Sequence, residues 1–130
     1  MGAWSHTSFG NDDASDFVYE VEEDGRAAVA NAFEVVNFLP KDEYLEAPDA
    51  SVALAAAELV AAAGGKPPKD FPEQAAAVVP KVTEHRVLRT DALSAVKRVL
   101  EKSELRELWA QTEHFDAWRA EVENLIERLK

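Results

Sequence analysis

The chain has 130 residues, no cysteine and a formal net charge of −11. This length fits one domain with a sizeable core, and the lack of cysteine excludes disulfides and thiolate metal sites. The acidic balance argues against nucleic-acid binding, which relies on Lys and Arg at phosphates. No signal peptide or membrane-spanning run is visible, so we expect a cytoplasmic protein that does not enter membranes.

The negative charge is concentrated in the first 50 residues. They hold twelve acidic residues against two basic ones, Arg26 and Lys41, whereas residues 51–130 hold thirteen acidic and twelve basic residues. An acidic surface attracts a basic partner or a cation, but a small domain also needs net charge for solubility. The sequence leaves both interpretations open.

The predicted elements are all helices, and no strand-type alternation occurs. The first helix begins after Asn11, whose side chain can cap a first turn. Asp12 and Asp13 lie in that turn, where their negative charge interacts favourably with the positive end of the helix dipole. This helix is predicted to end near Gly25, because glycine commonly follows the last residue of a helix. A second helix is predicted over residues 26–39, up to the next proline.

The middle of the chain is predicted to hold an alanine-rich helix. The preceding loop contains Tyr44 and Leu45, which we expect to fill gaps in the core. The helix is predicted to start at an Asp49 cap and to end at Gly64, which is followed by a second glycine. Alanine is the best helix former and permits close packing, so we place this helix centrally.

Further helices are predicted after a Lys-Pro-Pro-Lys linker. Asp70 and Glu73 resemble a capping box, and the helix they begin stops before Pro80. Residues 81–89 fit either a helix or an irregular run, and a helical pattern returns from Thr90. A last predicted pair consists of a short helix capped by a serine at position 103 and a final helix over residues 115–129.

These elements define a single all-α domain over residues 1–130, an irregular bundle of five to seven helices. We expect the first and last helices to pack near each other, with Trp4 beside Trp109 or Trp118. The aromatic residues expected to build the core are Trp4, Phe9, Phe17, Phe33, Phe38, Trp109, Phe115 and Trp118.

No arrangement of residues that would carry catalysis is evident. The three histidines are dispersed, and no pair has the spacing of a zinc or di-iron motif. Neither a nucleophile elbow nor a phosphate-cradling glycine loop occurs. Capping and dipole effects account for Asp12, Asp13 and Asp16 without a metal. We therefore predict no catalytic residues, metal ligands or cofactors.

Two signatures, one near each end of the chain, indicate a known family. The first comprises Met1-Gly2-Ala3-Trp4, Phe9, Asn11-Asp12-Asp13-Ala14 and Asp16-Phe17, and the second comprises the run from Ser103 to Trp109 with Trp118 and Leu129. Together they resemble the bacterial family called domain of unknown function 4259, although Ser5 and Thr7 stand where glycine is expected. The resemblance implies a bacterial origin and a compact fold, and it implies no activity.

Three functions are compatible with these observations. The leading hypothesis is a non-enzymatic interaction module that binds a basic protein through its acidic N-terminal half, for example a toxin-neutralising protein of the immunity type. One alternative is a structural or assembly subunit, since the oligomeric state is open. The other is an enzyme or small-ligand binder whose pocket is formed by Trp4, Asp12, Asp13, Asp16, Arg106 and Trp109.

Overall fold

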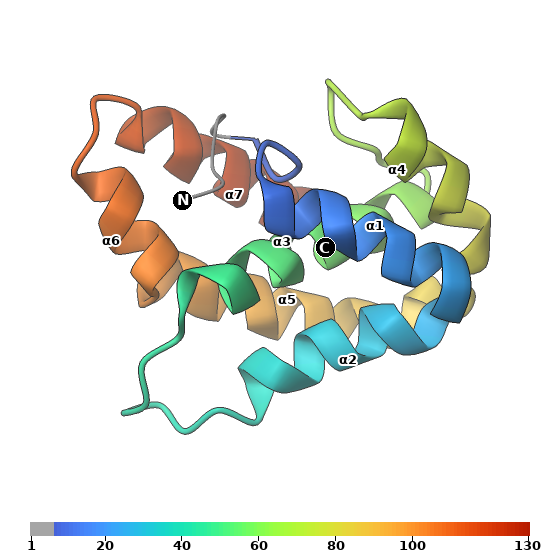
Figure 1. The fold of residues 1–130 in the computed structure, drawn as a ribbon, viewed down its shortest axis with the longest axis horizontal. Helices are drawn as coiled ribbons and strands as arrows, with labels where there is room; N and C mark the ends of the chain where they lie inside the picture. Colours follow the sequence, from blue (N-terminus) through green and yellow to red (C-terminus); the bar gives the residue numbers. More distant parts are fainter. Residues whose placement is uncertain (1–6) are drawn as a thin grey trace.

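The structure, a computed structural model, describes residues 7–130, and this part of the chain folds into seven α-helices (Figure 1). In chain order they are α1 (Asp12–Asp24), α2 (Arg26–Asn37), α3 (Ala47–Ala63), α4 (Glu73–Val78), α5 (His85–Glu101), α6 (Glu104–Ala110) and α7 (Phe115–Leu129), with a 3-10 turn, η1 (Val79–Lys81), after α4. No strand occurs between residues 7 and 130, and the predicted all-α class is confirmed.

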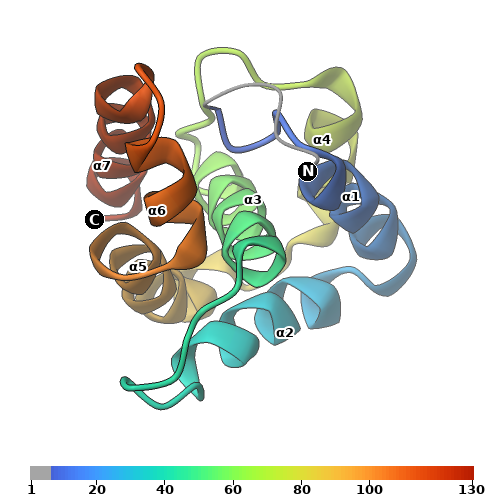
Figure 2. The ribbon, with the colours of Figure 1, turned by 60° about the vertical axis from the view of Figure 1, so that its left-hand side comes forward.

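Helix α3 runs through the centre of the bundle, and each of the other helices contacts it (Figure 2). Its buried residues surround the helix axis instead of forming one stripe, as expected for a helix enclosed by protein. Those residues are Ala50, Ser51, Ala53, Leu54, Ala55, Ala56, Ala57, Glu58, Leu59, Val60 and Ala61. The predicted central position of the alanine-rich helix is therefore confirmed.

The first and last helices lie on opposite sides of α3 (Figure 2). Helix α1 packs against α2, α3 and α4, whereas α7 packs against α3, α5 and α6. The expectation that these two helices pack near each other is therefore wrong, because α3 lies between them. Trp4, which was expected to join these two regions, lies outside the described residues.

Three predicted helix boundaries, at Asn11, Gly25 and Ser103, are confirmed. The Asn11 side chain accepts a hydrogen bond from the N–H of Ala14 at 2.8 Å, and Ser103 accepts one from the N–H of Arg106 at 3.1 Å. Gly25 ends α1 and starts α2 with a φ of 58°, a left-handed conformation that glycine adopts without strain.

The start of α3 differs from the prediction. The helix begins at Ala47 instead of after an Asp49 cap, and the N–H of Ala47 donates to the Glu104 carboxylate at 2.8 Å. The N–H of Glu104 in turn donates to the carbonyl of Leu45 at 2.9 Å. The cap is thus supplied by a residue distant in sequence, for which no local pattern exists.

Helix α4 also starts later than predicted. Asp70 does not cap it, because the helix begins at Glu73 and Pro72 is its N-cap residue. Proline disfavours the helical conformation in the residue before it, here Phe71. The Phe71 ring instead packs against Phe9, with ring centroids 5.8 Å apart, which attaches the segment before α1 to the bundle.

Two aromatic residues expected in the core lie at the surface. Phe38 is 79% exposed, and Tyr44 is also exposed, whereas Leu45 is buried as predicted. Phe38 follows Asn37, the last residue of α2. At this end of α2 the side chain that points into the core is that of Val36. Phe38 is two positions further along, so its side chain faces away from the core.

Residues 81–89, which by sequence fit either a helix or an irregular run, contain the end of a 3-10 turn and the first residues of α5. The turn η1 ends at Lys81, Val82 is buried, and α5 begins at His85. Glu84, which precedes α5, has a φ of 56°, and its carboxylate lies 3.4 Å from the Arg26 guanidinium.

Candidate functional site

The outward side of α1 carries a row of carboxylates. Asp12, Asp16, Glu20 and Glu23 follow one another at intervals of three or four residues and are all exposed, a spacing that places them along one side of a helix. The Tyr19 side chain, 64% exposed, lies beside this row. We call these four carboxylates the α1 acidic face.

Within the described part of the chain, the carboxylates of the first 50 residues make no ion pairs. Among these twelve acidic residues, eleven are exposed and Asp13 is half-buried. Within residues 7–130, none of the twelve makes an ion pair, because the carboxylates that do so belong to later residues. The negative charge of this surface is therefore not neutralised within the described part of the molecule.

A groove of about 200 Å³ lies next to the α1 acidic face, between α1, α2 and α3. It is lined by Phe17, Glu20, Ala28, Asn31, Ala32, Val35, Asp49 and Val52. The lining combines apolar side chains with two exposed carboxylates, those of Glu20 and Asp49. We call it the acid-lined groove.

The three aspartates of the predicted ligand pocket lie at the surface of α1. Asp12 and Asp13 occupy its first turn, as the capping interpretation expects, and Asp16 lies one turn further. Within residues 7–130, no hydrogen bond or ion pair connects these carboxylates to Arg106.

The C-terminal members of that predicted pocket lie on α6, on the other side of α3 from α1 (Figure 2). The Arg106 guanidinium lies over the Phe115 ring at 5.1 Å from its centroid, and Trp109 packs partly buried against the core. The structure therefore does not bring these two residues together with the aspartates of α1. Because Trp4 lies outside the described residues, this ligand pocket stays a prediction.

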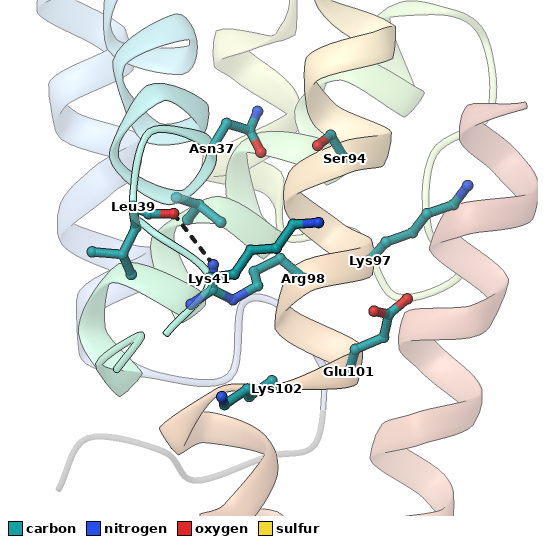
Figure 3. A pocket seen from close by; sticks show the side chains of 9 residues that line it. Asn37, Leu39, Lys41, Ser94, Lys97, Arg98, Glu101 and Lys102 are labelled. Carbon is teal, nitrogen blue, oxygen red and sulfur yellow. Dashed lines mark hydrogen bonds between the residues drawn. The ribbon is translucent and has the colours of Figure 1, made fainter. Parts of the chain in front are cut away.

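A larger hollow of about 390 Å³ lies between α2, the loop after it and α5 (Figure 3). Its lining residues are Val36, Asn37, Leu39, Lys41, Ser94, Lys97, Arg98, Glu101 and Lys102. The Arg98 guanidinium donates to the backbone carbonyls of Leu39, Pro40 and Glu43, the last at 2.8 Å. Arg98 therefore connects the α2–α3 loop to α5, a contact that no local sequence pattern predicts.

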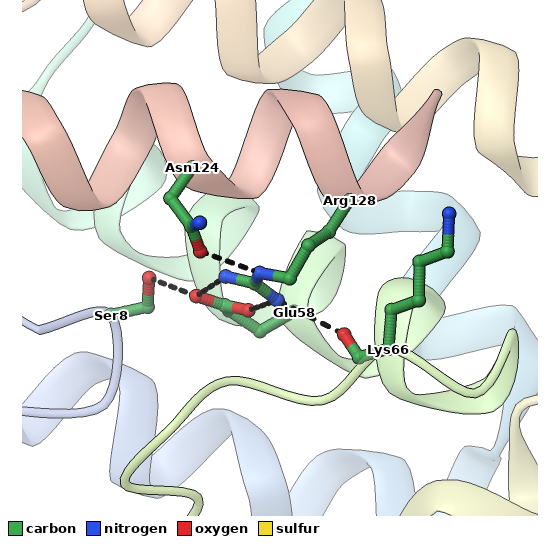
Figure 4. A network of polar contacts seen from close by, with 5 residues as sticks. All are labelled: Ser8, Glu58, Lys66, Asn124 and Arg128. Atoms are coloured by element: carbon green, nitrogen blue, oxygen red, sulfur yellow. Dashed lines mark hydrogen bonds and ion pairs between the residues drawn. The ribbon is translucent and has the colours of Figure 1, made fainter.

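Among residues 7–130, the most buried charged group is Glu58, in the second half of α3 and 1% exposed (Figure 4). Its carboxylate accepts two hydrogen bonds from the Arg128 guanidinium, at 2.7 and 3.2 Å, and one from the Ser8 hydroxyl at 3.1 Å. Arg128 also donates to Asn124 at 2.7 Å and to the carbonyl of Lys66 at 3.1 Å. This network joins the segment before α1 to α3 and α7.

Sequence reasoning missed this network, although one signal for it exists. Glu58 is the only charged residue between Ser51 and Gly65 in an otherwise mostly apolar run. A lone carboxylate in a helix that is apolar on all sides must be paired, because a buried unpaired charge is strongly unfavourable. The sequence does not show which cation is the partner.

We expect Glu58 to make stability depend on pH. Burial raises the pKa of its carboxyl above the ordinary value of 4.5, and the Arg128 hydrogen bonds offset only part of the rise. The folded state thus binds this proton more tightly than the unfolded state. The resulting stabilisation is present below pH 4.5 and is lost as the pH rises through the folded pKa.

Chemical denaturation at a series of pH values measures this effect. The free energy of unfolding of the wild type, minus that of Glu58→Gln, is expected to fall as the pH rises from about 4 towards 7. A difference that stays constant, or that increases with pH, would contradict the raised pKa.

Between residues 7 and 130, no three His, Asp or Glu side chains are grouped so that they could hold a metal ion. Among the same residues, no helix has both the length and the apolar character needed to cross a membrane.

Residues 7–130 form a small all-helical domain whose acidic N-terminal surface makes no ion pair within this range. The chain belongs to the family described as Domain of unknown function (DUF4259), whose model matches residues 2–121. This match confirms the family resemblance and covers nearly the whole chain. No curated protein and no solved structure matches the chain.

Proposed function

We propose that this protein is a non-enzymatic interaction module that binds a basic protein through the α1 acidic face and the acid-lined groove. The observation that supports this most directly is the row Asp12, Asp16, Glu20 and Glu23, exposed and without ion-pair partners in residues 7–130. A surface that served solubility alone would need no adjoining groove with apolar walls.

The acid-lined groove has the chemistry to receive a Lys or Arg side chain. Such side chains bury an apolar stem and keep the charged head outside. Phe17, Ala32 and Val52 offer apolar contact to the stem, and the carboxylates of Glu20 and Asp49 offer acceptors to the head. The negative charge around the acid-lined groove would accelerate association with a cationic surface and make the association sensitive to salt.

The narrower form of this proposal is a toxin-neutralising protein of the immunity type, acting in the cytoplasm of a bacterium. A basic toxin would present the cationic surface that the α1 acidic face requires. A toxin gene beside the gene of this protein would support that form.

Charge reversal of Glu20 tests the proposal. The immobilised protein is exposed to a bacterial lysate at low ionic strength, and the retained basic protein is identified and then purified. Glu20→Lys is expected to weaken its binding by about tenfold or more, because the substitution replaces an attraction with a repulsion. Isothermal titration calorimetry with the purified partner measures the change.

Glu113→Lys is the matched control, since Glu113 is exposed and belongs to the loop before α7. It makes the same change in net charge and is expected to leave binding nearly unchanged. Equal binding by Glu20→Lys and the wild type, or equal loss in both variants, would contradict recognition through this surface. So would the failure to retain any basic protein at low ionic strength.

A further inference from the structure

A second hollow of about 200 Å³ lies where the end of α3, the start of α5 and the end of α7 meet. Its lining residues are Val60, Ala61, Gly64, Lys66, His85, Arg86, Arg89, Arg128 and Leu129. Four of these carry a fixed positive charge, and none is acidic. We call it the cationic pocket.

This grouping of charge runs against the composition of the chain. The protein has 25 acidic residues and 14 basic ones, so a pocket lined by four basic residues and no acidic residue is unexpected. Arg26, Arg119 and Lys130 lie elsewhere and pair with carboxylates. Within residues 7–130, the side chains of Lys66, Arg86 and Arg89 make no hydrogen bond or ion pair.

The arrangement is also unfavourable without a ligand. Arg86 and Arg89 are three residues apart on α5, where like charges repel each other. Both belong to the beginning of that helix, at the positive end of its dipole. No acidic residue stands in the first turn of α5 and no side chain caps it, while the Glu84 carboxylate lies beside Arg26. A bound anion would relieve both effects.

Structural roles account for only two of the four basic residues that line the cationic pocket. Arg128 is held by Glu58, and Lys66 follows the C-terminal end of α3, where a positive charge is favourable. Neither reason applies to Arg86 or Arg89. The contacts of Arg128 with Glu58 and Asn124 also fix one wall of the pocket before any ligand arrives.

We propose that the cationic pocket binds a phosphate group, either as free phosphate or as a phosphate monoester. A guanidinium presents a planar fork of donors that matches two phosphate oxygens. The pocket volume admits one such group, and two unpaired guanidiniums with one ammonium supply its donors. This site is separate from the acid-lined groove, so its test is independent of the proposed function.

Calorimetric titration at constant ionic strength tests this proposal with two probes, inorganic phosphate and free phosphoserine. The wild type is expected to bind at least one of them saturably. The double variant Arg86→Gln/Arg89→Gln is expected to bind at least about tenfold more weakly, because it loses the charge-assisted hydrogen bonds. The probe that binds more tightly shows whether the natural ligand is a free phosphate or an ester.

The matched control is Lys97→Gln/Lys102→Gln, which also removes two positive charges but from the hollow between α2 and α5. It is expected to bind like the wild type. Arg86 and Arg89 are exposed, so the test variant is expected to stay folded, which circular dichroism checks. No saturable binding by the wild type, equal weakening in both double variants, or weakening in the control alone would overturn the proposal.

Discussion

Replacing Arg128 with methionine is expected to lower the free energy of unfolding by about 3–5 kcal/mol at neutral pH. The Glu58 carboxylate is 1% exposed, and within residues 7–130 the Arg128 guanidinium donates two of the three hydrogen bonds that it accepts. Methionine keeps an apolar side chain of similar length but leaves this carboxylate buried and unpaired. Denaturant unfolding followed by circular dichroism measures the loss.

Two further variants separate the buried pair from a general effect of removing an arginine. Arg119→Met changes the same helix, but Arg119 forms a half-exposed pair with Glu123 at 3.4 Å, and such surface pairs contribute at most about 1 kcal/mol. The double variant Glu58→Gln/Arg128→Met removes the unpaired charge and is expected to recover part of the loss. If Arg128→Met cost no more than Arg119→Met, the pair would not be important for stability.

The loss caused by Arg128→Met is also expected to shrink in acid. Burial raises the pKa of the Glu58 carboxyl, so this group is protonated in the folded state before it is protonated in the unfolded state. Below pH 4.5 it is neutral in most molecules of both states, and no charge is left unpaired. The same unfolding measurement near pH 4 checks this dependence.

The comparison of sequence and structure shows which features depend on local interactions. Asn11 and Ser103 were predicted as caps, and both accept the hydrogen bond from the first turn of their own helix. The start of α3 was placed incorrectly because the N–H of Ala47 is satisfied by Glu104, 57 residues away. Local patterns therefore place helices, and tertiary contacts adjust their ends.

The candidate sites also combine features that local sequence patterns predict with features that depend on tertiary contacts. The acidic character of α1 is readable from the sequence, because it depends only on residue type and helical spacing. The acid-lined groove was not predictable, since it requires Asp49 of α3 to approach Glu20 of α1. The cationic pocket likewise combines three helices that are distant in sequence, and Arg86 and Arg128 have no common local pattern.

Replacing Trp118 with alanine is expected to lower the free energy of unfolding by about 3–5 kcal/mol. Trp118 is 2% exposed and stacks with Phe115 at a centroid distance of 6.0 Å. It belongs to α7, which packs against both α3 and α5. The substitution would leave a cavity in the core, because α3 and α5 each pack against several other helices and cannot easily move to fill it.

A graded set of variants tests this explanation by thermal and denaturant unfolding. Trp118→Phe keeps most of the buried ring and is expected to lose less stability than Trp118→Ala. Tyr19→Ala removes an aromatic side chain that is 64% exposed, so its cost is expected to stay within about 0.5 kcal/mol. Equal effects of Trp118→Ala and Tyr19→Ala would show that α7 can repack around the missing indole and that α3 does not hold its neighbours rigidly.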